Sequence, residues 1–171
     1  MKLFFFKKNR IHSLPIKEYS LKDKNDETLD IVYHGTLNDF NPNDIKSPCW
    51  FSIEEEQSVK WIYYKYKKNK CQGLKTGYLH KFKFVEKPVL LDINDDSDYR
   101  LDINANGNYN FSQKIMNGDY GEYDGYINLE DQAEIMLCNP SKYLKVVETT
   151  KIQIEKVYDL TYQKTPKGWR L

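Results

Sequence analysis

The sequence has little cysteine, and its three cysteines show no paired spacing. Cys49, Cys71 and Cys138 are an odd number and lie far apart in the chain. A disulfide scaffold or a structural zinc site needs cysteines in even sets or at short paired spacings. The sequence therefore argues against both, and we predict no metal site. Reduced, buried cysteines suit a protein that stays in a reducing compartment.

A long hydrophobic run is also missing. The apolar stretch at residues 3–6 is too short for the core of a signal peptide. No stretch approaches the roughly 20 apolar residues that cross a bilayer. We therefore expect no membrane partner and a cytoplasmic location, either in the cell that makes the protein or in a host cell that receives it.

The chain has no excess of charge of either sign. It carries 26 Lys and Arg against 25 Asp and Glu, a net charge of +1, and the two signs are interspersed. A strongly basic balance would favour nucleic acid as a partner, and this balance makes that partner less favoured without excluding it. Internal repeats and low-complexity segments are absent as well, so we expect an ordinary folded domain.

What is present is enough for one soluble domain. The chain has 171 residues, of which 40% are hydrophobic and 30% charged, a composition typical of globular proteins with a sizeable core. We predict a single domain over 1–171, with a leader and surface loop at 1–27, a core at 28–160 and a tail at 161–171.

Hydrophobic periodicity predicts several strands and one clear helix. The helix has Ser52 as its N-cap, acidic residues in its first turn, and a last turn rich in lysine that ends near Lys68. The predicted strands are 31–36, 50–52, 77–85, 88–93, one within 121–129, 133–138, and one or two within 143–158.

The remaining segments are predicted as loops or short helices. Residues 37–49 form a loop with one helical turn, and 94–108, dense in Asp and Asn, form another loop. A short helix at 109–116 is stopped by Asn117-Gly118. Several strands with one helix between the first strands and the rest indicate an α+β fold with a mostly antiparallel sheet.

The most informative stretch is His34-Gly35-Thr36, at the end of the strand predicted at 31–36. The glycine lets the chain turn or lets a ligand approach the backbone. The histidine offers two ring nitrogens at that point. Taken alone, this stretch is better explained by a core histidine bonded to the backbone and followed by a turn. Two later stretches, Trp50-Phe51-Ser52 and Glu134-Ile135-Met136-Leu137, favour the functional interpretation.

With these three stretches in this order, the chain resembles the ADP-ribosyltransferase superfamily, and within it the branch of diphtheria-like toxins and poly(ADP-ribose) polymerases. The similarity covers roughly residues 30–145. The resemblance implies a split pair of twisted, mainly antiparallel β-sheets, a helix after the second motif strand, and NAD as co-substrate in the cleft between the sheets.

The resemblance also implies roles for individual residues. His34 and Glu134 match the catalytic residues, and His34 would hold the hydroxyl of the nicotinamide-side ribose. Gly35 matches a glycine whose backbone bonds the nicotinamide amide, and Thr36 matches a small hydroxyl residue near the adenosine ribose. On the following helix, Ser58 matches a serine that bonds the nicotinamide carbonyl.

Two aromatic residues belong to the same implied site, and one of them departs from the family. Trp61 matches an aromatic residue that stacks on the nicotinamide ring. Trp50 stands where the family usually has Tyr, which keeps a stacking face and loses the phenol. Gln132 gives a Gln-x-Glu spacing typical of the other large branch, where the first strand carries Arg instead of His. Asp124-Gly125 is similar to a bend that some relatives have before the Glu strand.

The chemistry of the residues agrees with this assignment. The nicotinamide–ribose bond breaks through an oxocarbenium-like state, and a carboxylate beside that ribose stabilises the positive charge. Glu134 lies on an apolar strand, where burial would be costly without such a role. Strand alternation equally allows Glu134 to point to water from an edge strand. Likewise, Trp50, Trp61 and Ser58 each have an ordinary structural explanation when taken singly.

We therefore predict a mono-ADP-ribosyltransferase that cleaves the nicotinamide–ribose bond of NAD and transfers ADP-ribose to a macromolecule. We expect a protein acceptor, with nucleic acid left open, and acceptor contacts in the loop at 120–132. The alternatives are an inactive NAD-binding or protein-interaction module, an NAD glycohydrolase, and a plain structural domain. Transfer of an RNA 2′-phosphate to NAD is disfavoured, because Arg10, Arg100 and Arg170 lie beside no motif.

Overall fold

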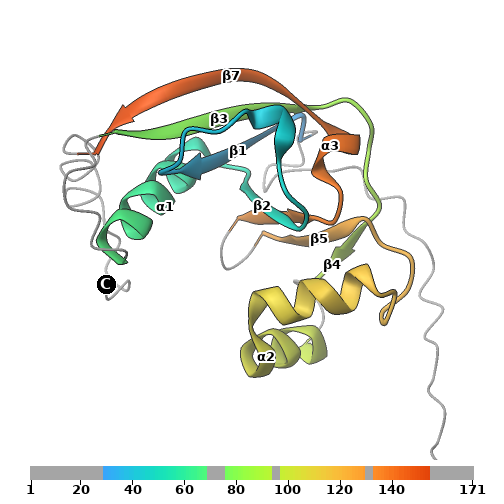
Figure 1. Cartoon of the computed structure of the whole chain (residues 1–171). Helices are drawn as coiled ribbons and strands as arrows, with labels where there is room; N and C mark the ends of the chain where they lie inside the picture. Colours follow the sequence, from blue (N-terminus) through green and yellow to red (C-terminus); the bar gives the residue numbers. More distant parts are fainter. Residues whose placement is uncertain (1–28, 69–75, 94–96, 130–132, 155–171) are drawn as a thin grey trace, which may run out of the picture.

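The computed structural model describes residues 29–68, 76–93, 97–129 and 133–154 (Figure 1). Its helices are α1 (Glu55–Lys68), α2 (Ser97–Met116) and the short α3 (Pro140–Tyr143), with a 3-10 turn at Pro42–Asp44. Its strands are β1 (Ile31–Thr36), β2 (Cys49–Ser52), β3 (Thr76–Phe84), β4 (Leu90–Asp92), β5 (Gly125–Asn128), β6 (Glu134–Leu137) and β7 (Leu144–Gln153).

Within these ranges the seven strands form one sheet in the order β4-β5-β6-β2-β1-β3-β7. Every neighbouring pair is antiparallel except β4 and β5, which run parallel. The predicted α+β class with a mostly antiparallel sheet is confirmed. Among the described helices, none is long and apolar enough to cross a membrane.

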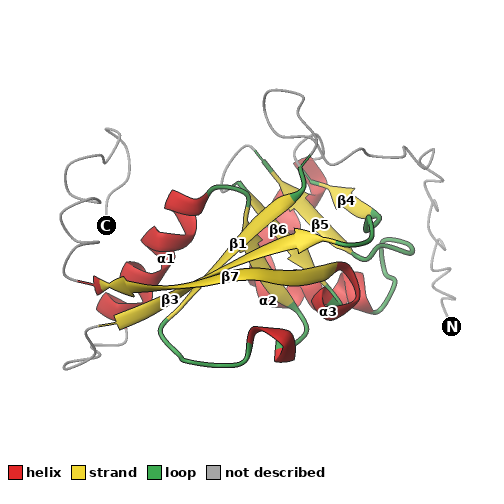
Figure 2. Ribbon diagram, turned by 90° about the horizontal axis from the view of Figure 1, so that it is seen from above, coloured by secondary structure: helices red, strands yellow, loops and turns green. Residues whose placement is uncertain are grey.

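The sheet is held together weakly at its middle. Strands β1 and β2 share a single register pair, Tyr33 with Ser52, whereas β1 and β3 share six pairs. The two strands diverge beyond that point, so β1, β3 and β7 form one part of the sheet and β2, β6, β5 and β4 the other (Figures 1 and 2). The divergence leaves side chains of both parts facing a common space.

Helix α1 covers the part of the sheet formed by β1, β3 and β7 (Figure 2). The predicted helix is confirmed, and its buried residues Ile62 and Tyr63 pack against Leu79 of β3. Gly35 allows the close approach, because a Cβ atom there would lie 2.1 Å from the Ser58 carbonyl oxygen. The glycine of the His34-Gly35-Thr36 stretch is thus required for helix packing.

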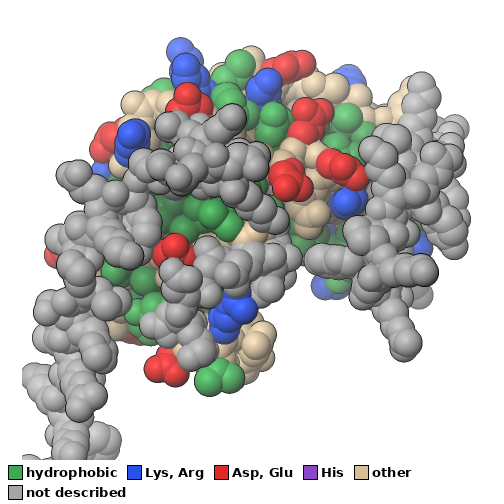
Figure 3. Space-filling model, turned by 180° about the vertical axis from the view of Figure 1, so that it is seen from behind, with side chains coloured by type: hydrophobic (Ala, Val, Ile, Leu, Met, Phe, Trp, Pro, Cys, Tyr) green, Lys and Arg blue, Asp and Glu red, His purple; other side chains and the backbone are tan. Residues whose placement is uncertain are grey.

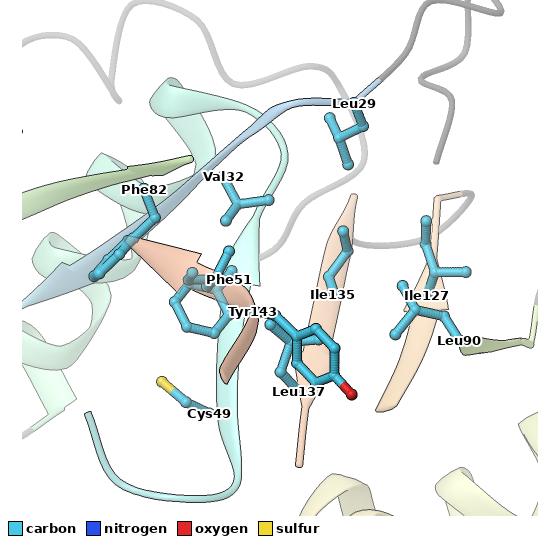
Figure 4. Close-up of a cluster of buried hydrophobic side chains, with 11 residues drawn as sticks. Leu29, Val32, Cys49, Phe51, Phe82, Leu90, Ile127, Ile135, Leu137 and Tyr143 are labelled. Carbon is cyan, nitrogen blue, oxygen red and sulfur yellow. The ribbon is translucent and has the colours of Figure 1, made fainter. Parts of the chain in front are cut away.

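The main hydrophobic core lies on the opposite face of the sheet and spans both of its parts (Figure 4). It combines residues of β1, β2, β3 and β6, including Val32, Phe51, Phe82 and Ile135. Each of these side chains is at most 2% exposed. Burial of such side chains contributes about 1.5–3 kcal/mol each. This core holds together the two parts that one register pair joins.

Helix α2 corrects the prediction of a loop at 94–108, since 97–106 and 108 are helical and Gly107 alone departs from helical geometry. Tyr99, Ile103, Phe111 and Ile115 pack with Met136 of β6, and their spacing by multiples of four residues forms an apolar stripe on the helix. Polar residues of low helix propensity separate these positions, so the helical pattern is not evident in the sequence. Packing against the sheet outweighs that propensity.

A kink at Gly107 divides α2 into two segments. Gly107 has φ +80° and ψ 157°, a conformation that is essentially confined to glycine. Across the kink, Asp102 accepts a 2.6 Å ion-pair contact from Lys114 and a short hydrogen bond from the Tyr120 hydroxyl. The predicted helix at 109–116 is therefore the second segment of a longer, bent element.

Smaller differences concern the ends of elements. Ser52 belongs to β2 while α1 begins at Glu55, so the predicted N-cap role of Ser52 is wrong. The helical turn in 37–49 is confirmed at Pro42–Asp44, and α3 was not predicted. Cys71, Gln132 and the predicted segments 1–27 and 161–171 lie outside the described residues.

Candidate active site

A cavity of about 390 Å³ opens where β1 and β2 diverge. Its walls come from β1, β2, α1, α2 and β6. Six of the seven residues proposed from the sequence line it, namely His34, Gly35, Trp50, Ser58, Trp61 and Glu134. These six are distributed over a hundred residues of sequence, and the fold brings them together around one space.

Thr36 is the proposed residue that does not line the cavity. It is buried, and its Oγ1 accepts a 3.1 Å hydrogen bond from the Asn38 backbone N–H. This bond stabilises the turn that follows β1. In this structure Thr36 helps to form the turn after the motif. It does not line the cavity, so its proposed contact with an adenosine ribose would have to lie elsewhere.

The His34 ring is fixed by one hydrogen bond. Its Nδ1 lies 2.9 Å from the Trp50 carbonyl oxygen, so Nδ1 carries the hydrogen and Nε2 is left as an acceptor. Burial, opposed by this hydrogen bond, lowers the pKa of His34 to about 4. At neutral pH the ring is therefore uncharged and offers Nε2 as an acceptor for a hydroxyl hydrogen.

Two other groups close to His34 serve the core. The Cys49 Sγ lies 3.7 Å from His34 Nδ1, but burial raises the pKa of the thiol to about 12, so it is not a nucleophile at neutral pH. His80 on β3 is fully buried, and its Nδ1 is bonded to Thr149 Oγ1 at 2.9 Å. His80 is therefore a core residue, and its buried Nε2 has no hydrogen-bond partner among the described residues.

Glu134 is buried on an interior strand. β6 lies between β5 and β2, and Glu134 is 5% exposed, so the alternative of an edge strand with Glu134 in water is wrong. Its Oε1 accepts a 2.8 Å hydrogen bond from the Tyr126 hydroxyl. Burial raises the pKa of Glu134, and the Tyr126 hydrogen bond opposes that rise. Glu134 is thus a desolvated carboxylate held by one donor at the cavity wall.

Trp50 joins the same hydrogen-bonded chain. Its Nε1–H donates a 2.9 Å hydrogen bond to the Tyr126 hydroxyl oxygen, which in turn donates to Glu134. Trp50 and Tyr126 both pair with Met136 in the sheet, and Glu134 is two residues before Met136 on β6. The three side chains therefore lie on the same face of neighbouring strands. Trp50 therefore uses its indole N–H, which a tyrosine would lack, for a hydrogen bond within the protein.

Helix α1 places three side chains on the cavity, at positions 58, 61 and 65. Ser58 is 1% exposed, and Trp61 presents an aromatic ring. The Lys65 Nζ lies 3.5 Å from the Gly35 carbonyl oxygen, and burial lowers its pKa. Lys65 was not proposed from the sequence, although its helical spacing from Ser58 and Trp61 was the available signal. It provides a positive charge at the cavity.

Helix α2 adds residues that sequence reasoning missed. Asn108 and Tyr109, directly after the kink at Gly107, line the cavity. A second cavity of about 340 Å³ adjoins the first, and Asn108 and Glu134 line both. Arg100 lines this second cavity together with Glu134. It therefore lies near a motif residue in the fold, although no motif is beside it in the sequence. No short-range signal connects position 100 with position 134.

No family model, curated protein or solved structure matches the chain. The interpretation of the site therefore depends on the arrangement of its own residues, with the resemblance of the three motif stretches as an added argument.

Proposed function

We propose that the protein is an NAD-dependent mono-ADP-ribosyltransferase with the split-sheet fold of that superfamily. The observation that carries the proposal is the convergence of His34, Gly35, Trp50, Ser58, Trp61 and Glu134 on one cavity. The order of the three motif stretches is a property of the sequence. That their side chains meet at one cavity is a property of the fold, and it does not follow from that order.

The architecture supports the same proposal. A split pair of sheets requires a place where the strands separate, and β1 and β2 share only the pair Tyr33 and Ser52. The cavity opens at that place. The helix expected after the second motif strand is α1, which begins three residues after β2 ends. The acceptor loop at 120–132 lies partly outside the described residues, since 130–132 are not described.

The cavity has groups suited to each part of NAD near the scissile bond. Trp61 and Trp50 offer aromatic faces to the flat nicotinamide ring. Gly35 lines the cavity and offers its backbone to the nicotinamide amide. His34 Nε2 accepts a ribose hydroxyl hydrogen, and Lys65 offers an ammonium to the two negative phosphates.

Glu134 carries the chemical step in this proposal. When neutral nicotinamide leaves, positive charge develops on the ribose, and a carboxylate in a desolvated wall stabilises it far better than one in water. The Tyr126 hydroxyl fixes the carboxylate before the substrate arrives. Preorganisation of this kind reduces the cost of reorganisation during the reaction.

The Trp50 departure is compatible with an active enzyme. Its N–H donates to the Tyr126 hydroxyl, which in turn holds Glu134. The replacement keeps an aromatic face at the cavity and adds a donor to the hydrogen-bonded chain.

The test is incubation of the full chain with NAD, with and without cell lysate, while free nicotinamide and label on macromolecules are measured. Glu134→Gln keeps the size of the side chain and its acceptor for Tyr126. We expect NAD binding to persist in this variant while turnover falls roughly 100-fold or more, as for loss of one preorganised transition-state group. Glu148→Gln, at an exposed position on β7, is the matched control.

The outcomes separate the alternatives. Label on macromolecules that is lost in Glu134→Gln supports the transferase. Release of nicotinamide without label identifies a glycohydrolase. Saturable NAD binding without consumption identifies an inactive module, and absence of NAD binding contradicts the proposal as a whole.

A further inference from the structure

We infer that the second cavity is the acceptor site and that its acceptor is a nucleobase. This inference rests on the proposed function, because it assigns the second substrate of the same Glu134. The two cavities share Glu134 and Asn108, so a group bound in the second cavity and NAD bound in the first would adjoin the same carboxylate. A transfer reaction needs its donor and acceptor to meet at one such group.

The polar lining of the second cavity suits a neutral group with both donors and acceptors. Three carboxamides, those of Asn104, Asn108 and Asn128, face it, and each carries an N–H donor and a carbonyl acceptor. Arg100 adds planar donors and Glu134 adds an acceptor. Carboxamide and guanidinium groups pair in the plane with the edges of nucleobases.

The apolar lining and the size point the same way. Ile93 and Ile103 give this mainly polar cavity a small apolar surface, which suits one face of a flat ring whose edges are polar. The volume of about 340 Å³ lies within the range of roughly 300–1,000 Å³ typical of small-molecule sites. The terminal carboxamide of a protein side chain, with three heavy atoms, would leave most of that space unfilled.

A carboxylate acceptor fits the cavity less well. It would approach the buried Glu134, and two carboxylates in such a site repel strongly. A nucleobase is neutral and avoids this cost.

The source of the base is a single strand or a free nucleotide. A base inside a duplex is stacked and paired, so it enters a side pocket only after it leaves the stack. Among the described side chains on the face in Figure 3, acidic and basic groups are intermixed, and the net charge of the chain is +1, so this face has no field of one sign to hold a duplex. Recognition then depends on the cavity.

The reaction balances with the groups present. The bond between ribose C1′ and the nicotinamide nitrogen breaks, and its electron pair neutralises the pyridinium. A nitrogen of the base that carries a hydrogen forms the new bond to C1′, and its proton passes to the Glu134 carboxylate and then to water. The products are an ADP-ribosylated base, nicotinamide and one proton, with no oxidant or reductant.

The experiment uses the full chain and NAD labelled in its adenylate phosphate. The acceptors are single-stranded deoxyribo- and ribo-homopolymers of each base, the corresponding mononucleotides, and a protein mixture. We expect label on one kind of base that nuclease releases and proteinase does not. Label on strands or on mononucleotides both supports the inference and identifies the source of the base.

The variant is Asn104→Leu, which removes a carboxamide that lines only the second cavity. We expect the ratio of labelled base to released nicotinamide to fall roughly tenfold, the effect of losing one or two hydrogen bonds in a binding site. Asn110→Leu, at an exposed position on the same helix and lining neither cavity, leaves this ratio unchanged.

Three results would overturn the inference while cleavage of NAD at this site stands. One is label on protein alone, and another is transfer to a base that Asn104→Leu does not reduce. Nicotinamide release that depends on Glu134 but labels no base also overturns it. Loss of the proposed function itself is recognised separately, because then no nicotinamide is released and no NAD is bound.

Discussion

The Tyr126 hydroxyl on β5 donates a 2.8 Å hydrogen bond to the Glu134 carboxylate on β6. The two residues are diagonal neighbours on the same face of the sheet, since Tyr126 pairs with Met136 and Asn128 pairs with Glu134. Through this bond, Tyr126 controls both the position of the carboxylate and its pKa. It is a positioning residue, and its removal has consequences that differ from those of removing Glu134.

Tyr126→Phe should shift the pH dependence of NAD turnover. The hydrogen bond lowers the pKa of Glu134, so its loss raises that pKa further and protonates the carboxylate at higher pH. We expect the acid limb of the pH–rate profile to move to higher pH, while activity above this limb falls about tenfold from lost positioning. The measurement is nicotinamide release as a function of pH.

A merely structural role for Tyr126 would lower activity without moving the acid limb, and that result would contradict the assignment. Tyr123→Phe is the control, because Tyr123 packs against the same hydrophobic cluster and lines neither cavity. Its profile should match that of the unmodified protein.

Gly35→Ala should destabilise the fold. The new Cβ would lie 2.1 Å from the Ser58 carbonyl oxygen and 2.9 Å from the Ile62 Cγ1 atom. The first of these is backbone, so α1 has to move away from β1. We expect the free energy of unfolding in urea to fall by about 1–3 kcal/mol, the usual cost of overpacking. An unchanged midpoint of urea unfolding would show that α1 does not pack closely against Gly35.

Lys65→Met should weaken NAD binding without affecting nicotinamide. The ammonium lies at the cavity where a dinucleotide needs a partner for its phosphates, and its loss should raise the Kd for NAD roughly tenfold. The difference should shrink at high salt. Free nicotinamide has no phosphate, so its affinity should stay the same, as should NAD affinity in Lys60→Met, which removes a lysine ion-paired with Glu56 at 3.2 Å.

The partly buried His34 should make the fold less stable in acid. Above its unfolded pKa of 6.5 the ring is neutral in both states, so its contribution to stability is complete. Between 6.5 and about 4 the unfolded chain binds a proton that the folded chain does not, and stability falls by about 3 kcal/mol in total. Urea titrations across this range, compared with His34→Gln, should show the steeper loss only when His34 is present.

The sequence predicted those parts of the fold that depend on local pattern. The β-branched and aromatic run at β1, the alternation at β3 and the helical spacing in α1 are each confirmed. Local patterns are sufficient there because each element has an apolar side of regular period. Helix α2 was missed because Asn and Asp separate its apolar positions and Gly107 interrupts its backbone.

The candidate site was predictable to the extent that its residues stand in motifs. His34, Trp50 and Glu134 could be chosen because each belongs to a recognisable stretch. Tyr126 was assigned no role, since its bond to Trp50 joins residues 76 positions apart. Arg100 was dismissed for the same physical reason: contacts between distant segments are set by packing and leave no local signal.

The bond between Trp50 and Tyr126 also limits how this protein can evolve. A change of Trp50 to Phe would leave the Tyr126 hydroxyl without its donor, and a change of Tyr126 to Phe would leave the indole N–H without its acceptor. Either unpaired group in this half-buried pair costs on the order of 1–3 kcal/mol. We therefore expect the two positions to vary together among descendants of this sequence, as a correlated pair that also marks which of them still bind Glu134 in the same way.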